Sequence, residues 1–203
     1  MTIILFIFIN FFATLLYSSQ FKFQADGEFL EYQENGITIN KLTDNVQVFN
    51  DSLYLETDQA YNYKALNKLH LYGNTKMISN QDTLICDSMI YWMDKDSLFA
   101  FGNVELTQVN SQLNAQELYF WETNGYRGSS FIANGDVNVM DLDKIIQADN
   151  ISYDDFSQTM ILADNAKVLS NSRKIFGESI NINFKDSLIT FIDVAGNAIA
   201  HNI

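Results

Sequence analysis

The sequence predicts an all-β protein built from repeats of about 30 residues, and three observations support this fold class. No segment after residue 20 has the spacing of an amphipathic helix. The 203 residues include 16 Phe and 10 Tyr but no proline, a composition that favours extended hydrogen-bonded sheet. Two short motifs also recur in step along the chain. Together these features predict a stack of short strands.

The composition limits the partners and the organisation of the chain. The chain contains 12 Lys and Arg and 25 Asp and Glu, which gives a net charge of -13. A nucleic acid or an anionic membrane surface would therefore be repelled. Cys86 is the only cysteine, which excludes an intramolecular disulfide. The length suits one β domain, which we expect to span residues 20–203.

The N-terminus carries an apolar run, residues 3–17, interrupted only by Asn10 and Thr14. A helix of this length reaches about 22 Å, less than the roughly 30 Å hydrocarbon core of a bilayer. We therefore expect residues 1–19 to be a cleaved export signal. A retained membrane anchor is the alternative, because no Lys or Arg precedes the run and Leu16 and Tyr17 suit a cleavage site poorly.

The first recurring motif is a pair of turn-forming residues followed by an apolar alternation, as in Gly102-Asn103-Val104-Glu105-Leu106. Its first apolar position falls at residues 46, 75, 104, 137, 166 and 198, in steps of 29, 29, 33, 29 and 32. Gly, Asn and Asp tolerate positive φ in tight turns. The motif therefore predicts hairpin turns that lead into half-buried strands.

The second motif places an acidic or amide residue between two apolar alternations, at positions 26, 58, 87, 116, 149 and 178. Apolar residues change from even to odd numbers, or the reverse, at this position: Leu84 and Cys86 precede Asp87, whereas Met89 and Tyr91 follow it. Since side chains alternate between the two faces of a strand, this change predicts a bulge or corner. A corner in every repeat would fold the stack of strands into a V.

The inside of such a V would gather apolar side chains along one crease. The crease residues predicted are Val46, Val48, Met77, Val104, Leu106, Leu118, Phe120, Val137, Val139, Ile151, Val168 and Ile180. Any one of them could instead fill a closed core, since most inward-facing strand residues pack against protein.

The recurring acidic positions Asp58, Asp87, Asp149 and Glu178 could also suggest a metal site or catalytic carboxylates. Catalysis needs two unlike carboxyl groups in one place, whereas these recur once per repeat and are replaced by Gln116 in one unit. We therefore expect them to accept backbone N–H bonds at the bulges. The two histidines lack metal-ligand spacing, so no metal, cofactor or catalytic residue is predicted.

Three smaller expectations concern packing and charge. Cys86 occupies a slot that holds small residues in other repeats, so it should be a packing residue. The aromatic pairs 91–92 and 120–121 fall at strand ends and should cap the core, although a position at the entrance to the crease is an alternative. Lys76, Lys167 and Lys174 are candidate contacts at the rim of the crease.

The repeat of turn-Asn-Val-x-Val followed by Ala-Asp-x-Ile-x-Tyr, from Ala25-Asp26 to Gly196-Asn197, resembles the OstA-like family of lipopolysaccharide-transport periplasmic proteins. This family includes LptA, LptC and the N-terminal domain of LptD. The resemblance implies an open V-shaped β-jellyroll whose crease holds the acyl chains of lipopolysaccharide or lipid A. It implies no enzyme activity and no cofactor.

The resemblance also implies a periplasmic location and particular partners. Such domains stack head to tail as homo-oligomers and join inner-membrane LptC-like and outer-membrane LptD-like proteins, which bridges the two membranes. The unfinished repeat at residues 198–203 would offer an edge for this contact. The alternatives are a membrane-anchored LptC-like component, a ligand-free structural or adhesin β-solenoid and, ranked last, a sugar-acting β-helix enzyme.

Overall fold

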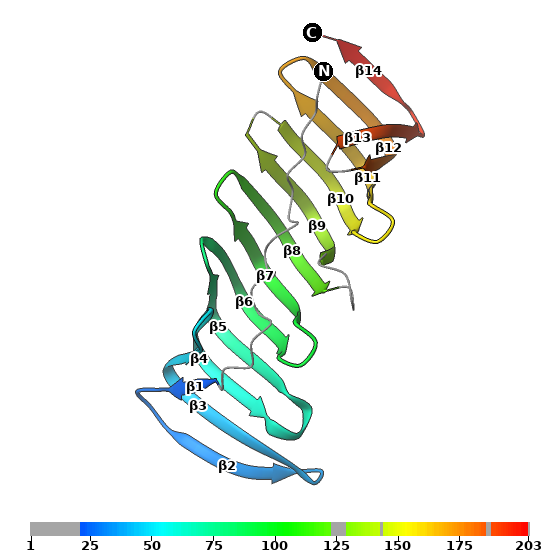
Figure 1. Cartoon of the computed structure of the whole chain (residues 1–203). Helices are drawn as coiled ribbons and strands as arrows, with labels where there is room; N and C mark the ends of the chain where they lie inside the picture. The colour runs from blue at the N-terminus through cyan, green and yellow to red at the C-terminus, as the bar shows by residue number, and fades with distance from the viewer. Residues whose placement is uncertain (1–20, 123–128, 143, 186–187, 203) are drawn as a thin grey trace.

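The computed structural model describes residues 21–122, 129–142, 144–185 and 188–202. They form fourteen strands and one short 3-10 helix in a single elongated stack (Figure 1). The elements are β1 (Lys22–Gln24), β2 (Phe29–Glu34), β3 (Ile37–Phe49), β4 (Leu53–Tyr63), η1 (Lys64–Leu66), β5 (Lys68–Ser79), β6 (Asp82–Trp92), β7 (Ser97–Thr107), β8 (Ser111–Glu122), β9 (Ser129–Asp141), β10 (Lys144–Asp154), β11 (Thr159–Ser170), β12 (Arg173–Lys185), β13 (Leu188–Ala195) and β14 (Ile199–Asn202). The predicted all-β class is confirmed. The expected signal or anchor, residues 1–19, lies outside the described residues.

All strands belong to one antiparallel sheet in which each long strand pairs with the next one along the chain. The two ends of the sheet do not pair with each other, so the sheet is open. At one end β1 and β2 both pair with β3, and at the other end β13 and β14 both pair with β12. Each of these short pairs is the two halves of one terminal strand. No helix within the described part of the chain is long and apolar enough to cross a bilayer.

Every long strand bends near its middle, at a bulge where two residues oppose one. Tyr72 pairs with Ser88 and Thr75 pairs with Cys86, so Gly73 and Asn74 of β5 lie opposite the single residue Asp87 of β6. Both bulge residues have positive φ, +76° for Gly73 and +45° for Asn74. A pair of left-handed residues inside a strand turns its direction sharply. The predicted corner in every repeat is therefore confirmed.

The same bulges show that the hairpin prediction is wrong. The Gly-Asn, Gly-Asp and Asp-Asn motifs of β3, β5, β7, β9 and β11 lie inside strands and mark the corners, and Gly196-Asn197 lies between β13 and β14, whereas the chain reverses elsewhere. The actual reversals fall, for example, at residues 50–52, 80–81 and 108–110, and at η1. The misreading has a physical reason: two successive residues of positive φ also make the type I′ hairpin turn, so the chemistry of the two structures is the same.

The corners divide the sheet into two limbs that face each other across a concave side. Limb A consists of β2, β13 and residues 37–43, 59–63, 68–72, 88–92, 97–101, 117–122, 129–134, 150–154, 159–163 and 179–185. Limb B consists of β1, β14 and residues 46–49, 53–56, 75–79, 82–86, 104–107, 111–115, 137–141, 144–148, 166–170 and 173–177.

A side-chain contact between a carboxylate and an amide recurs along the convex corner. The amides of Asn74, Asn103 and Asn165 donate hydrogen bonds of 2.8, 3.0 and 2.9 Å to Asp58, Asp87 and Asp149, and Asn197 donates likewise to Glu178. The expectation that these acids accept backbone N–H bonds is wrong, because the partner in each case is the asparagine of the next bulge.

At one corner the carboxylate and the amide exchange positions. Gln116 takes the place of the acid, and the bulge that faces it is Gly135-Asp136 in place of Gly-Asn. One carboxylate and one amide are thus kept at this corner. The corner contacts are exposed and hold the bend.

Candidate ligand-binding trough

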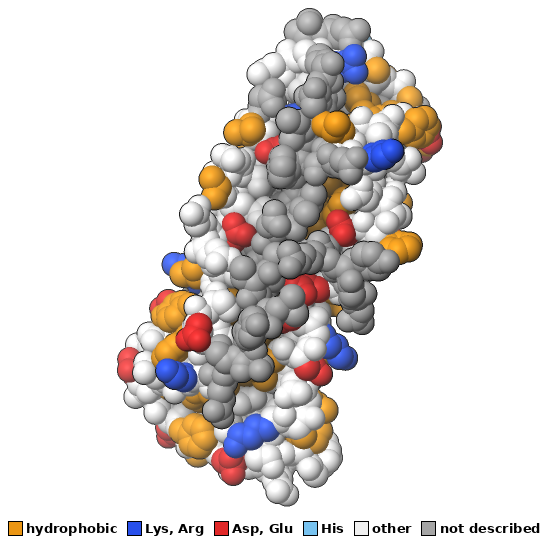
Figure 2. Space-filling model, in the orientation of Figure 1, with side chains coloured by type: hydrophobic (Ala, Val, Ile, Leu, Met, Phe, Trp, Pro, Cys, Tyr) orange, Lys and Arg blue, Asp and Glu red, His pale blue; other side chains and the backbone are white. Residues whose placement is uncertain are grey.

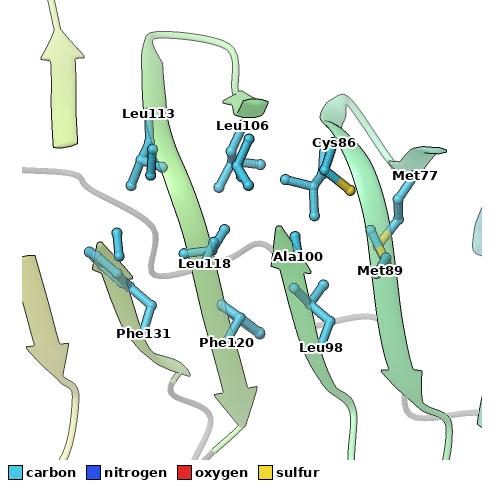
Figure 3. Close-up of a cluster of buried hydrophobic side chains, with 14 of the residues drawn as sticks. Met77, Cys86, Met89, Leu98, Ala100, Leu106, Leu113, Leu118, Phe120 and Phe131 are labelled. Atoms are coloured by element: carbon cyan, nitrogen blue, oxygen red, sulfur yellow. The ribbon is translucent and has the colours of Figure 1, made fainter. Parts of the chain in front are cut away.

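The concave side of the bent sheet is a continuous apolar trough. On limb B one row of paired residues runs Leu55, Met77, Leu84, Leu106, Leu113, Val139, Ile146, Val168 and Ile175. On limb A the facing row runs Leu71, Met89, Ala100, Leu118, Ala133, Ile151, Leu162, Ile180 and Val194. Both rows belong to one hydrophobic cluster, part of which Figure 3 shows. Burial of such a surface needs only apolar contact and no hydrogen-bonding motif.

The structure brings all twelve predicted crease residues to this one face. Eleven of them are at most 3% exposed, from Val46 and Ile180 at 0% to Phe120 at 3%. Val168 is half-buried and packs against the same cluster.

Sequence reasoning missed half of the trough wall on limb A. Leu69, Leu98, Phe131 and Met160 also face inward, on the parts of β5, β7, β9 and β11 that precede the Gly-Asn type bulges. The alternation of apolar residues before each bulge could have identified them as inward-facing. Because each bulge motif was read as the start of a strand, the apolar residues before it were not counted.

The trough is sealed in its middle and more open toward β12 and β13. Ile175, Phe184, Ile192 and Val194 are half-buried although they continue the inward-facing rows. The middle of the trough contrasts with this, since Leu84, Leu98 and Leu113 are 0% exposed. The apolar surface thus reaches the last strands without being fully covered.

Aromatic residues line the outer part of the limb A wall. The ring of Phe131 lies 6.1 Å from that of Tyr153, which lies 6.1 Å from Phe184, and Phe21 meets Tyr91 edge to face at 6.3 Å. Burial raises the pKa of both phenols, and each donates to an aspartate at the strand end: Tyr91 to Asp96 at 3.3 Å and Tyr153 to Asp155 at 3.1 Å. Within the aromatic pairs noted in the sequence, Tyr91 and Phe120 belong to the buried cluster.

Cys86 lies in the trough beside the corner, 2% exposed. Burial, with the neighbouring Asp87, raises the pKa of its thiol to about 12. Since the thiolate is the reactive form, we expect Cys86 in the folded protein to react with iodoacetamide at pH 8 about a thousandfold more slowly than in urea-unfolded protein. Timed alkylation followed by mass spectrometry measures both rates. Similar rates would show that the thiol is open to water.

Glu122 follows Leu118 and Phe120 on the inward face at the end of β8. Burial, and secondly the charge of Asp96, raises its pKa from 4.5 to about 7. The folded state therefore holds the proton more tightly, so the free energy of unfolding should fall as pH rises from about 4.5 to about 7 and then level off. Urea titrations across this range should show a smaller fall for Glu122→Gln than for the unaltered protein. Equal slopes, or a change matched by the control Glu56→Gln on the outer face, would contradict this.

The histidines and the acids form no metal centre in the described part of the chain, where no group of three or more His, Cys, Asp or Glu converges. His70 packs on the outer face of limb A between the rings of Tyr63 and Tyr72. Burial, and secondly Lys68, lowers the pKa of His70 to about 4. This imidazole is neutral near pH 7. His201 lies exposed in β14.

The three candidate rim lysines point away from the trough. Lys76 and Lys167 alternate with inward-facing neighbours, so both point to the outer surface of limb B, where Lys167 lines a depression with Asp136 and Asp149. The rim interpretation is therefore wrong for these two. Basic side chains are scattered over the face that Figure 2 presents, with no single basic patch. Lys174 lies between the inward-facing Arg173 and Ile175, so it too points to the outer surface of limb B, and the rim interpretation is also wrong for it.

An open antiparallel sheet, bent at a regular corner and lined by apolar rows on its concave side, defines a repeat β-jellyroll. The family model described as "LptA/(LptD N-terminal domain) LPS transport protein" matches residues 83–187, which is more than half of the chain. The chain belongs to this family.

Two further comparisons complete this picture. Thirteen solved chains match the structure, among them LptH of Pseudomonas aeruginosa, the LptA-homologous periplasmic component of a lipopolysaccharide transport device. That match covers 87% of this chain and 82% of LptH at 12% identity, with a TM-score of 0.24. No curated protein matches the chain in sequence.

Proposed function

We propose that this protein is a periplasmic component of lipopolysaccharide transport that holds the acyl chains of the lipid in its trough. The observation that carries the proposal is the pair of unbroken apolar rows on one concave face, which run from β4 to β12 on limb B and from β5 to β13 on limb A. An acyl chain forms no hydrogen bonds, so its binding requires only a continuous apolar surface. Membership of a transport family supports the same assignment.

The net charge of the protein fits this mode of binding. A chain of charge -13 repels the phosphates of lipid A when they approach at random. Binding through the tails avoids that conflict, because the head group can stay at the outer ends of the limbs in contact with water. Lipid would then move along the trough passively, driven by an energised partner elsewhere.

We further infer assembly through the ends of the sheet. The outer edges of β1 and β2 and of β13 and β14 form no strand pairs within the described residues. Such edges add strands from another chain readily. A neighbouring copy, or an LptC-like or LptD-like domain, would extend the sheet and continue the trough toward either membrane.

A second candidate function is a ligand-free structural module with a closed interior. The near-complete burial of Leu84, Leu98 and Leu113 favours it, since side chains that already lack contact with water gain less from a lipid. The two candidates differ in whether the limbs separate to admit acyl chains.

Native mass spectrometry of the protein purified from its own cell envelope tests the proposal. We expect a bound acylated glycolipid, and we expect the purified protein to take up a fluorescent lipid A analogue. A ligand-free monomer that also fails to take up the analogue would overturn the transport function and favour the structural module. N-terminal sequencing of the same sample would show whether residues 1–19 are removed.

A further inference from the structure

The outermost inward-facing row of limb B is mostly polar, although the row directly beneath it, from Leu55 to Ile175, is apolar. It includes Asp82, Gln108, Ser111, Asp141, Lys144 and Arg173, each at the end of its strand or beside it. Alternation along each strand puts these residues on the trough side: Lys144 shares a face with Ile146, and Arg173 shares one with Ile175. We name this row the limb B lip.

Hydrogen bonds tie parts of the limb B lip together. The amide of Gln108 donates to Asp82 at 3.1 Å, and the hydroxyl of Ser111 donates to Gln108 at 3.2 Å. Ser79 precedes them in the row, and its hydroxyl oxygen is buried without a hydrogen-bond partner in the described structure. A buried polar atom without a partner costs free energy, so it marks a place where a polar ligand would be accommodated.

The charge of the lip changes sign along the trough. Asp82 lies at the β6 end, whereas Lys144 and Arg173 lie on β10 and β12, toward the more open end. Lys144 Nζ is 3.8 Å from the carboxylate of Asp141. Arg173 is exposed and belongs to neither ion pair found in the described residues. β10 and β12 are two strands apart, roughly 10 Å, which two long basic side chains span easily.

The opposite lip, on limb A, carries acids. Asp96, Glu122 and Asp155 lie at the strand ends there, two of them holding the phenols of the trough wall. An anionic group above the trough is therefore repelled from limb A and attracted to the basic part of limb B. The trough therefore differs in charge between its two lips, and also from one end to the other.

We propose that Lys144 and Arg173 form a phosphate contact that holds the anionic head group of the lipid over the limb B lip at β10 to β12. This inference rests on the proposed function, because it assumes that acyl chains occupy the trough below. It names the ligand chemistry of the lip as a phosphomonoester on a sugar that carries acyl chains. Arg173 supplies a planar guanidinium suited to paired phosphate oxygens, and Lys144 supplies a second positive charge.

The test compares lipid A with its dephosphorylated form, which has the same acyl chains. For Lys144→Gln combined with Arg173→Gln, we expect the Kd for lipid A to rise about tenfold and the Kd for the dephosphorylated lipid to stay the same. The matched control is Lys76→Gln combined with Lys167→Gln, which removes the same charge from the outer face of limb B. We expect the control to keep the affinity of the unaltered protein for both lipids.

Loss of Lys144 leaves the buried Asp141 without that cation and can weaken the fold, so Arg173→Gln alone provides a second arm. We expect it to raise the Kd for lipid A about threefold with no change in melting temperature. Inorganic phosphate at millimolar concentration should not displace lipid A, because the tails supply most of the binding. If free phosphate displaced lipid A, the site would be one for the inorganic ion, and the proposed contact with the lipid head group would be overturned.

The two levels of proposal fail differently. If the unaltered protein binds neither lipid, the transport function itself is contradicted. If it binds both lipids, and the double variant prefers lipid A over the dephosphorylated lipid as strongly as the control does, only the phosphate contact is overturned.

Discussion

Replacing Gly102 by alanine should lower the free energy of unfolding by about 2 to 4 kcal/mol. Gly102 has φ of +75° at the corner of β7, a conformation that costs an L-residue about 1 to 2 kcal/mol. A Cβ added there would also collide with the side chain of Asp87, whose carboxylate holds Asn103. The corner contact and the backbone are therefore disturbed together. Urea unfolding monitored by circular dichroism measures the loss.

A second glycine isolates the backbone part of this effect. Gly36 has φ of +79°, and a Cβ at that position would meet nothing within 4 Å. Gly36→Ala should therefore cost only about 1 kcal/mol. If the two variants lose the same stability, the collision with Asp87 contributes nothing. The double variant Gly102→Ala with Asp87→Ala should recover only part of the steric loss, because the Cβ of residue 87 remains 2.8 Å from the added methyl group, and it should recover none of the backbone loss.

The corners were predictable from sequence because they change which residues face inward. On β6 the buried residues move from Leu84 and Cys86 to Met89 and Tyr91, and only a bulge at Asp87 can keep both pairs on one side. The partner side of each bulge was not predictable in the same way. Gly102 and Asn103 together oppose a single residue of β8. The inward-facing Ala100 and Val104 on either side of them therefore both have even numbers, and the alternation in the sequence shows no break.

The lips were missed for a different reason. Residues such as Ser79 and Asp82 stand next to a chain reversal, where polar residues are expected for solvation alone. Their inward orientation follows from the alternation of their strands, since Ser79 shares a face with Met77 and Asp82 with Leu84, but a polar residue at a strand end does not itself mark the strand as continuing. Crease residues are different, because an apolar alternation already indicates the buried face. The trough wall could thus be predicted, whereas its polar margin required the structure.

Replacing Ala133 by phenylalanine should lower the affinity for lipid A at least about tenfold. Ala133 faces the trough at the middle of limb A, paired with Leu118 on one side and Ile151 on the other, and is 0% exposed. A phenyl ring there would occupy the space that the proposal gives to an acyl chain. Titration of a fluorescent lipid A analogue measures the change.

The same substitution on the other face of the sheet is the control. Ala163 of β11 pairs with Ser179 and Asn150 and points away from the trough, so Ala163→Phe should leave the affinity unchanged. The stability of Ala133→Phe separates the two candidate functions. If the limbs part to admit lipid, the ring finds room and the free energy of unfolding hardly changes. If the interior is closed, overpacking should cost about 1 to 3 kcal/mol, and the lipid should bind to neither variant nor to the unaltered protein.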